Sequence, residues 1–333
     1  MKKIIKIGVV IPNRNESKNI ADCIESLLPQ KDYIEKVVLV DDMSTDNSID
    51  VAKKLLKKFK SFKIIKSKKR LGAMGVLNEG IKYHTAEFLL FLASNDYAHP
   101  AFIKDSFNTL NNTAANPGIL TAMCNKIYDK KVKIHNSPVL SYKSKYFTNS
   151  ECDKFTIDLG NWITGSTTLF NRELLKKIKG FNVEYYGLSD LLTSIHLSSK
   201  KGAIYVPYPY GNMRMHKGFL YNTVTSESKV KLILNTLEKD KKSKIFKSTK
   251  FVKRMQERII YSSIVAGVDP SKYFSFFSNK KKCLLSFFKI LDFRLSNLKF
   301  LYLFVVIRPY DILSFFKYRY MRHFFLKIEK KFK

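Results

Sequence analysis

The sequence predicts an α/β protein in which helices flank a mostly parallel β-sheet. Over the first hundred residues, short apolar runs alternate with segments whose apolar residues recur at helical spacing. Strands that alternate with helices of this length favour a parallel sheet that is covered on both faces. The chain has 333 residues, of which 45% are hydrophobic, so it can bury a sizeable core and is not a wholly disordered chain.

Apolar runs predict the first strands, and the segments between them predict helices. The predicted strands are 4–11, 37–40, 62–65 and 88–92. The predicted helices begin with Ser17 as a cap, then near Asp46, and then at Gly72 for a helix that reaches Tyr83. In the first of these helices the apolar residues Ile20, Ile24, Leu27 and Leu28 share one face.

The second half is less regular. Residues 118–165 have a mixed, strand-rich pattern, 171–178 and 188–198 are predicted helices, and 203–206 is a further strand. We therefore predict one domain over residues 1–221, made of a first half at 1–117 and a second half at 118–221. Residues 222–333 are lysine-rich and predicted to be a helical C-terminal region.

The formal charge of +32 raises the alternative of a basic nucleic-acid-binding protein. No helix-turn-helix, zinc or RNP-type motif accompanies that charge, so no nucleic-acid partner is expected. The four cysteines stand far apart, at Cys23, Cys124, Cys152 and Cys283, which argues against a zinc site or a disulfide framework. Neither a signal peptide nor an apolar run long enough to span a bilayer is evident. We expect a cytoplasmic protein.

Acidic residues stand at predicted strand ends and loops, where parallel sheets bind ligands. These are the pair Asp41 and Asp42, then Asp96, and then Asp190. Each could instead cap the helix that follows it, and taken singly each is a weak signal. Their order and spacing are more specific.

Several segments follow one another in an order known from one enzyme family. They are VVIPNRNESKNIADCIESLL at 9–28, VLVDDMSTD at 38–46, RLG at 70–72, LNEGI at 77–81 and FLLFLASNDYAHP at 88–100. Together they resemble the inverting family 2 nucleotide-sugar glycosyltransferases, which have the two-lobed, Rossmann-like GT-A fold. The resemblance covers about residues 4–220 and is strongest over 4–100.

The resemblance implies a donor site for a nucleotide sugar, most simply a UDP-sugar. The residues implied in nucleotide-sugar binding are Pro12, Asn13, Arg14, Glu16, Asp42, Gly72, Asn78, Ser94 and Asn95. Asp42 matches the aspartate that contacts the base, and Asp96 the acid that holds Mn²⁺ or Mg²⁺. Asn95 departs from the family by replacing an acid with an amide. Leu77 stands where an arginine often contacts phosphate, and Arg70 or a nearby lysine is the candidate substitute.

The second half supplies the implied acceptor side. NWITGSTTLF at 161–170 resembles the strand that closes the donor pocket. Gly180-Phe181-Asn182 and Gly187-Leu188-Ser189-Asp190 resemble the block whose last acid is the general base, which assigns that role to Asp190. His216 is a candidate ligand of the metal or diphosphate, and its alternative is a structural histidine.

The residues after 270 are rich in aromatic and basic side chains. Residues 271–333 include 18 Phe or Tyr among interleaved lysines and arginines. Such helices can lie in the interface of an anionic membrane, and the alternative is a packed helical subdomain with a solvated basic face. The first alternative predicts an enzyme at the inner face of the cell membrane.

These observations predict an inverting glycosyltransferase that moves a sugar to a hydroxyl of a glycan or lipid-linked acceptor in surface-polysaccharide synthesis. A sugar nucleotidyltransferase is a further alternative, but Ile11-Pro12-Asn13-Arg14 lacks the glycines of its phosphate-binding start. The changes at Asn95 and Leu77 leave open a non-catalytic relative.

Overall fold

The computed structural model describes residues 4–128, 131–134, 138–159, 161–215, 219–242, 246 and 249–276. They fall into two compact units, each considered by itself. The first comprises Met1–Cys152, Ile163–Val183 and Ser189–His216. The second comprises Asp153–Trp162, Glu184–Leu188 and the described part of Lys217–Lys333. The predicted division into residues 1–221 and 222–333 remains a prediction.

The first unit contains a sheet of ten described strands in the order β3-β2-β1-β4-β9-β6-β10-β5, with β7 beside β6 and β8 beside β10. The strands are β1 (Ile7–Asn13), β2 (Ile34–Asp41), β3 (Phe62–Lys66), β4 (Phe88–Phe91), β5 (Tyr97–Ala98), β6 (Ile119–Tyr128), β7 (Lys131–Ile134), β8 (Lys145–Phe147), β9 (Thr168–Asn171) and β10 (Ala203–Arg214). Strands β1, β2, β3, β4, β6 and β10 share one direction, and β9 runs antiparallel between β4 and β6. The predicted α/β class with a mostly parallel sheet is confirmed.

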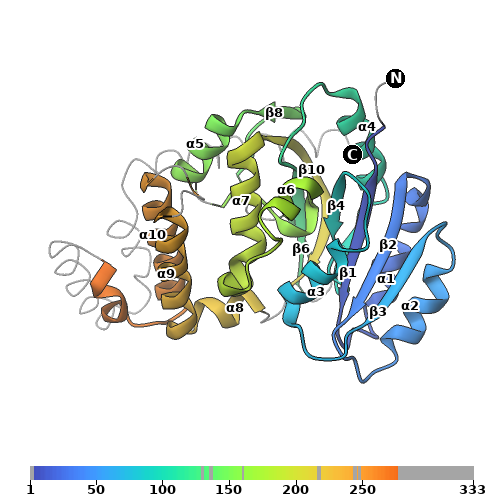
Figure 1. Ribbon diagram of the computed structural model, residues 1–333, viewed down its shortest axis with the longest axis horizontal. Coiled ribbons are helices and arrows are strands. Elements are labelled where there is room, and N and C mark those ends of the chain that lie inside the picture. Colours follow the sequence, from blue (N-terminus) through green and yellow to red (C-terminus); the bar gives the residue numbers. More distant parts are fainter. Residues whose placement is uncertain are drawn as a thin grey trace. The chain divides into compact units, whose positions relative to one another are not determined.

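The helices of the first unit cover the two faces of the sheet (Figure 1). They are α1 (Ile20–Glu25), α2 (Ser48–Leu56), α3 (Gly72–Ile81), α4 (Phe102–Asn112), α6 (Arg172–Lys177) and α7 (Ser189–Lys201), and α5 (Asn149–Leu159) continues into the second unit. Residues of α1, α2 and α4 pack in one core with Val9 and Leu39. Val38 and Val40 face the other way and pack with Val76 of α3. Successive strand residues point to opposite faces, so both faces of these buried strands are covered.

The order of the strands creates a place for a ligand. The chain moves from β1 to β2 and β3 on one side, and β4 then pairs with β1 on the other side. In open sheets this reversal leaves a crevice at the carboxyl ends of the strands that part. Here the crevice lies beyond the ends of β1 and β4.

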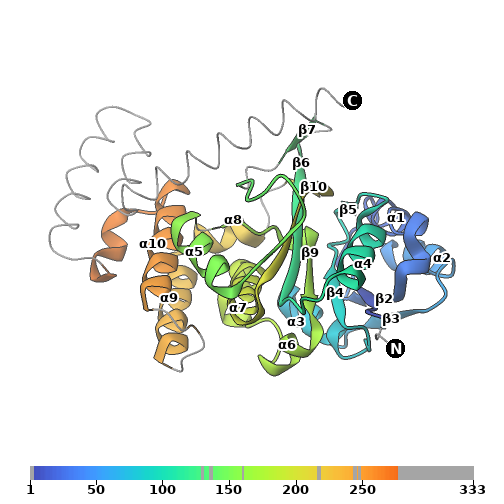
Figure 2. The ribbon, with the colours of Figure 1, turned by 90° about the horizontal axis from the view of Figure 1, so that it is seen from above.

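The second unit consists of helices. Helices α8 (Phe219–Val224), α9 (Glu227–Lys242) and α10 (Thr249–Val265) follow one another, and α9 and α10 lie side by side in both views (Figure 1, Figure 2). The Gln256 side chain of α10 donates to the Leu234 carbonyl and the Glu238 carboxylate of α9, at 3.2 and 3.1 Å. No helix in the described part of the chain is long and apolar enough to cross a membrane. The predicted membrane-interface segment, largely 277–333, lies outside the described residues.

One local prediction was wrong, and one predicted strand is longer than expected. Ser17 does not cap the first helix, because α1 begins at Ile20 after Asn19, and the Ser17 N–H instead donates to Asp46 at 2.8 Å. The strand predicted at 203–206 continues through Pro207 and Pro209 to Arg214, with register shifts on both sides of Pro209. A proline can stay in a strand at such irregularities because its missing N–H is not needed there.

Candidate active site

The loops at the carboxyl ends of β1 and β2 are held together by Asp41. Its carboxylate accepts hydrogen bonds from the Asn13 amide at 2.8 Å and from the Ser44 hydroxyl and N–H at 2.5 and 3.0 Å. The Asn13 amide group also donates to Ser48 at 2.9 Å, and its own oxygen is buried without a partner among the described residues. Asn13 therefore organises the loops and retains one acceptor.

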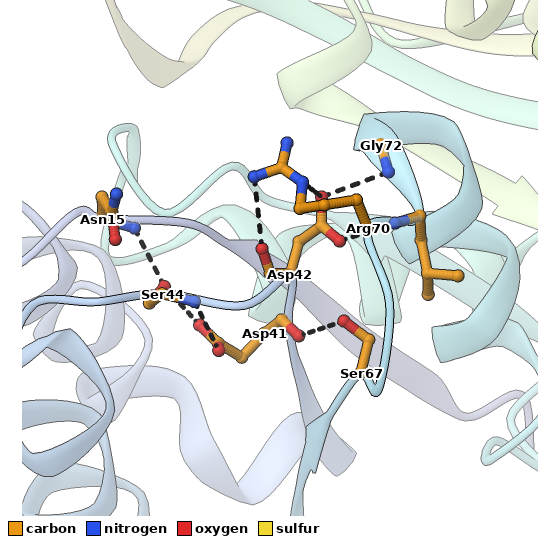
Figure 3. A network of polar contacts seen from close by, with 8 residues as sticks. Asn15, Asp41, Asp42, Ser44, Ser67, Arg70 and Gly72 are labelled. Atoms are coloured by element: carbon orange, nitrogen blue, oxygen red, sulfur yellow. Dashed lines mark hydrogen bonds and ion pairs between the residues drawn. The ribbon is translucent and has the colours of Figure 1, made fainter.

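Asp42 points away from Asp41, toward the start of α3 (Figure 3). Its two oxygens accept the N–H groups of Leu71 and Gly72 at 2.7 and 3.1 Å, and Arg70 lies 3.3 Å from the same carboxylate. A carboxylate at a helix N-terminus satisfies N–H groups that have no partner within the helix. Asp42 thus joins β2 to α3, and Arg70, the candidate phosphate contact, is paired with it. Contact of Asp42 with a base stays a prediction.

Of the other predicted nucleotide-binding residues, Asn78 has the clearest structural task. Its side chain donates to the Phe181 carbonyl at 2.8 Å and accepts the Phe181 N–H at 2.7 Å. Gly180, at φ +82°, allows this close approach, since an added Cβ would lie 2.2 Å from the Asn78 oxygen. Arg14 is exposed, and Glu16 accepts a hydrogen bond from Asn19 at 2.8 Å.

Asp96 lies in the loop after β4, where it is 4% exposed. Its oxygens accept the Ser166 hydroxyl and the Arg214 N–H, both at 2.9 Å. The Arg214 guanidinium donates to the Asn95 carbonyl at 2.8 Å and pairs with Asp22 of α1. Residues from α1, β10 and the segment before β9 therefore hold the predicted metal loop in place.

A cavity of about 180 Å³ lies at the carboxyl ends of β1 and β4. The residues that line it are Pro12, Ala73, Met74, Leu77, Phe91, Ala93, Gly165, Ser166, Phe170, Phe181 and Asp190. Its position is the crevice that the strand order predicts. Two of the predicted site residues, Pro12 and Asp190, therefore meet in one cavity, and Ser166 links that cavity to Asp96.

Asp190 occupies the first turn of α7. Its Oδ1 accepts the Leu191 N–H at 2.8 Å, and its Oδ2 lies against Gly165, where an added Cβ would come within 2.3 Å. Burial raises the pKa of this carboxyl group, and backbone N–H groups oppose the rise only in part. A carboxylate with a raised pKa, beside a cavity, is suited to accept a proton.

The described residues contain no group of three His, Cys, Asp or Glu that could hold a metal ion by themselves. Mg²⁺ is often bound by only one or two carboxylates together with substrate phosphates. Asp96, a buried carboxylate in the loop after β4, is the type of ligand that such a site uses, and it would be its single charged protein ligand. His216 lies outside the described residues, so its assignment as a ligand stays a prediction.

The sequence analysis gave several residues of this site no individual role. Ser166, Phe91 and Phe181 fall within segments that resemble the family, and Met74 has the ordinary appearance of a core residue. Arg214, two residues before His216, was not among the predicted site residues. That these residues lie at the cavity or at the Asp96 loop is apparent only from the three-dimensional structure.

The fold is that of an α/β protein of the GT-A type, with a cavity at the switch point of its sheet. The family model described as Glycosyl transferase family 2 matches residues 8–179, just over half of the chain. The chain therefore belongs to glycosyltransferase family 2 and is a glycosyltransferase.

Curated relatives have related activities. The chain is similar to a poly(ribitol-phosphate) beta-glucosyltransferase of Bacillus spizizenii, with 36% identity over 98 residues, which are 28% of this chain and 15% of the relative. It is also similar to the poly(ribitol-phosphate) beta-N-acetylglucosaminyltransferase TarP of Staphylococcus aureus, with 28% identity over 220 residues, 59% and 67% of the two chains. The chain covers 15% to 35% of the length of the first three relatives.

Solved structures share the fold at low sequence identity. S. aureus TarS 1–349 in complex with UDP-GlcNAc has a TM-score of 0.55 and 17% identity, covering 91% of this chain and 90% of that one. A mannosyltransferase of Pyrobaculum calidifontis in complex with GDP-Man and Mn²⁺ has a TM-score of 0.54 and 14% identity, covering 93% and 86%. These likenesses support the GT-A type of fold.

Burial of Asp190 has a consequence for stability. A raised pKa means that the folded chain binds the proton more tightly than the unfolded chain, so stability falls as pH rises between the two pKa values. Asp190→Asn keeps an acceptor for Leu191 and stays neutral. We expect the variant to melt at the same or a higher temperature than the native protein at pH 7.5. Below about pH 3.9 the Asp190 carboxyl group is protonated in both the folded and the unfolded native chain. Its ionisation should then no longer contribute to the difference in melting temperature between the two proteins.

Thermal melts of both proteins at pH 7.5 and at about pH 3 measure this effect. Asp158→Asn, a change of the same type outside the cavity, is the control. A lower melting temperature for the Asp190 variant at pH 7.5 would show that the carboxylate stabilises the fold and would contradict the argument.

Proposed function

We propose that this chain is an inverting glycosyltransferase that transfers a sugar from a nucleotide-diphosphate sugar, most simply a UDP-sugar, to a hydroxyl of a glycan or lipid-linked acceptor. The observation that carries the proposal is the cavity beyond β1 and β4, which contains Asp190 and connects through Ser166 to Asp96. The relatives that act on poly(ribitol-phosphate) support a place in surface-polysaccharide synthesis.

Asp190 is the proposed base. Transfer requires that the acceptor hydroxyl lose its proton as its oxygen attacks the anomeric carbon, and a carboxylate within hydrogen-bond reach can take that proton. Attack from the side opposite the diphosphate gives inversion. The Oδ2 atom of Asp190 has no hydrogen-bond partner among the described residues, whereas Oδ1 is held by Leu191. One oxygen is therefore fixed and the other is available.

The departing diphosphate needs positive charge. Mn²⁺ or Mg²⁺ is the proposed cofactor, with Asp96 as the protein's charged ligand, and a bound cation would neutralise charge on the diphosphate. The nucleotide would lie along the loops of Asn13 and Asp42, where the buried Asn13 oxygen has no donor among the described residues. A ribose or base donor group can satisfy it.

Incubation of the full chain with UDP-Glc, UDP-GlcNAc, UDP-Gal, GDP-Man and CMP-sialic acid, with and without Mn²⁺, tests the proposed donor class. We expect nucleotide release from one of the UDP-sugars.

Asp190→Asn should lower turnover by roughly 10²-fold or more, the usual effect of a positioned base, while UDP binding stays nearly unchanged. Because Asp190 must be ionised to accept a proton, the native rate should fall as pH drops through its raised pKa. Equal losses of turnover and UDP binding would make Asp190 structural instead.

The metal assignment can be tested separately by calorimetry of UDP binding with and without Mn²⁺. Asp96→Ala should abolish the gain in UDP affinity that Mn²⁺ provides, because it removes the charged ligand. Asn95→Ala, a neutral change at the neighbouring residue, should have a smaller effect. If the Asp96 variant retained the full gain from Mn²⁺, Asp96 would not hold the metal.

We further propose, from sequence alone, that the aromatic and basic residues of 271–333 bring the enzyme to the inner, anionic face of the cell membrane. Each basic residue near such a surface contributes about 1 kcal/mol, and buried rings are not screened by salt. The full chain should sediment with anionic vesicles, only partly release in high salt, and sediment weakly with neutral vesicles. Equal and negligible sedimentation with both would favour the packed helical subdomain.

A further inference from the structure

A second cavity, of about 290 Å³, lies in the first unit away from the Asp190 cavity. It lies between α4, β10 and the loop before β8, and its lining is Asp105, Asn108, Thr109, Ser144, Val206 and Tyr210. Five of these six side chains carry a polar group. The volume is near the lower limit for small-molecule sites, about 300 Å³, which suits a short ligand segment.

The polar groups of this cavity can both give and accept hydrogen bonds. The Tyr210 hydroxyl donates to Asp105 Oδ2, and the other oxygen of Asp105 has no hydrogen bond to the described residues. The Asn108 amide is exposed on α4, and the Ser144 hydroxyl is exposed on the loop. Burial, together with the bond to Asp105, raises the pKa of Tyr210 and keeps its hydroxyl protonated. The arrangement offers a carboxylate, an amide and hydroxyls to one ligand.

An aromatic surface lies beside the cavity. The Tyr208 ring is 4.7 Å from the Tyr210 ring and 5.5 Å from the His99 ring, and Tyr208 is 41% exposed. Tyr210 itself stacks on Phe102 at 5.4 Å, which fixes its position. An exposed tyrosine face next to convergent polar groups suits a molecule with one apolar face and many hydroxyls, as a sugar ring has.

The charge of the lining separates neutral from anionic ligands. Of the described residues that line the cavity, Asp105 alone has an acidic or basic side chain, and its carboxylate would repel a phosphate. A sugar hydroxyl can instead donate to it.

The cavity also lies beside the strand that leads to the proposed donor site. Strand β10 carries Tyr210 and, four residues further on, Arg214, whose N–H donates to Asp96. At the usual rise of a strand this separation is ~13 Å, a length that a short oligosaccharide can bridge.

We propose that this cavity binds a neutral saccharide segment of the acceptor, with its hydroxyls on Asp105 and Asn108 and a sugar ring on Tyr208. The binding of a neutral saccharide follows from the cavity itself, whereas its role as acceptor rests on the proposed function. The site would hold the acceptor chain at a distance from the reacting hydroxyl and would favour oligosaccharides over single sugars.

Saturation-transfer NMR on the full chain, with maltotriose, cellotriose and chitotriose as neutral probes and glycerol 3-phosphate as the anionic probe, tests this proposal. We expect transfer to at least one trisaccharide and weaker or no transfer to the phosphate. Asn108→Ala and Tyr208→Ala should each weaken trisaccharide binding roughly threefold to tenfold, the range of one lost hydrogen bond or ring contact. Asn112→Ala, on the same helix but outside the lining, is the matched control and should bind like the native protein.

Four outcomes would overturn the proposal. They are no transfer to any trisaccharide, preferred transfer to glycerol 3-phosphate, equal weakening by Asn112→Ala and Asn108→Ala, and loss of trisaccharide binding in Asp190→Asn. The last would place the saccharide in the donor cavity. Thermal melts confirm that each variant is folded. Trisaccharide binding without turnover of any nucleotide sugar would support the saccharide site and remove only its acceptor role, so the two proposals fail separately.

Discussion

The site depends on two adjacent buried carboxylates at the end of β2 that face opposite ways. Asp41 and Asp42 are 3% and 4% exposed, and a buried carboxylate is costly unless hydrogen bonds compensate it. Asp41 meets this need by holding the loop after β1 through Asn13. Asp42 meets it by accepting the first N–H groups of α3. The hydrogen bonds that compensate the two carboxylates therefore fix the end of β1, the loop after β2 and the start of α3, which lie around the crevice.

Much of the first hundred residues could be predicted because strands and helices there have strong, separate periodicities. The strands predicted at 37–40, 62–65 and 88–92 correspond to β2, β3 and β4 within a few residues. The helix boundary at Ser17 could not be predicted, since the competing partner, Asp46, lies 29 residues away in the sequence. Nor could α5, within a segment whose pattern looked strand-rich, because a weakly amphipathic helix has little periodic signal.

The predicted site divides in a similar way. Acidic residues at predicted strand ends and loops, such as Asp42, Asp96 and Asp190, can be detected in the sequence, because a buried carboxylate needs hydrogen-bond or metal partners. Asn78 shows its limit, because the amide that motif comparison assigns to the nucleotide is bonded on both sides to Phe181. Apolar lining residues such as Met74 and Phe91 have no such signal, since an apolar residue in a cavity and one in a core look alike in sequence. Their role follows from the strand order alone.

Gly165 explains how the two halves of the site can meet. The Oδ2 atom of Asp190 lies so close to this glycine that any side chain there would displace the carboxylate. The next residue, Ser166, donates to Asp96, so two consecutive small residues contact the proposed base and the proposed metal ligand. A small-residue segment before β9 is therefore a geometric requirement of a site in which one acid must stand near the acceptor and the other near the diphosphate. A larger residue at 165 would displace the Asp190 carboxylate, and an apolar residue at 166 would remove the hydrogen bond to Asp96, without changing either acid.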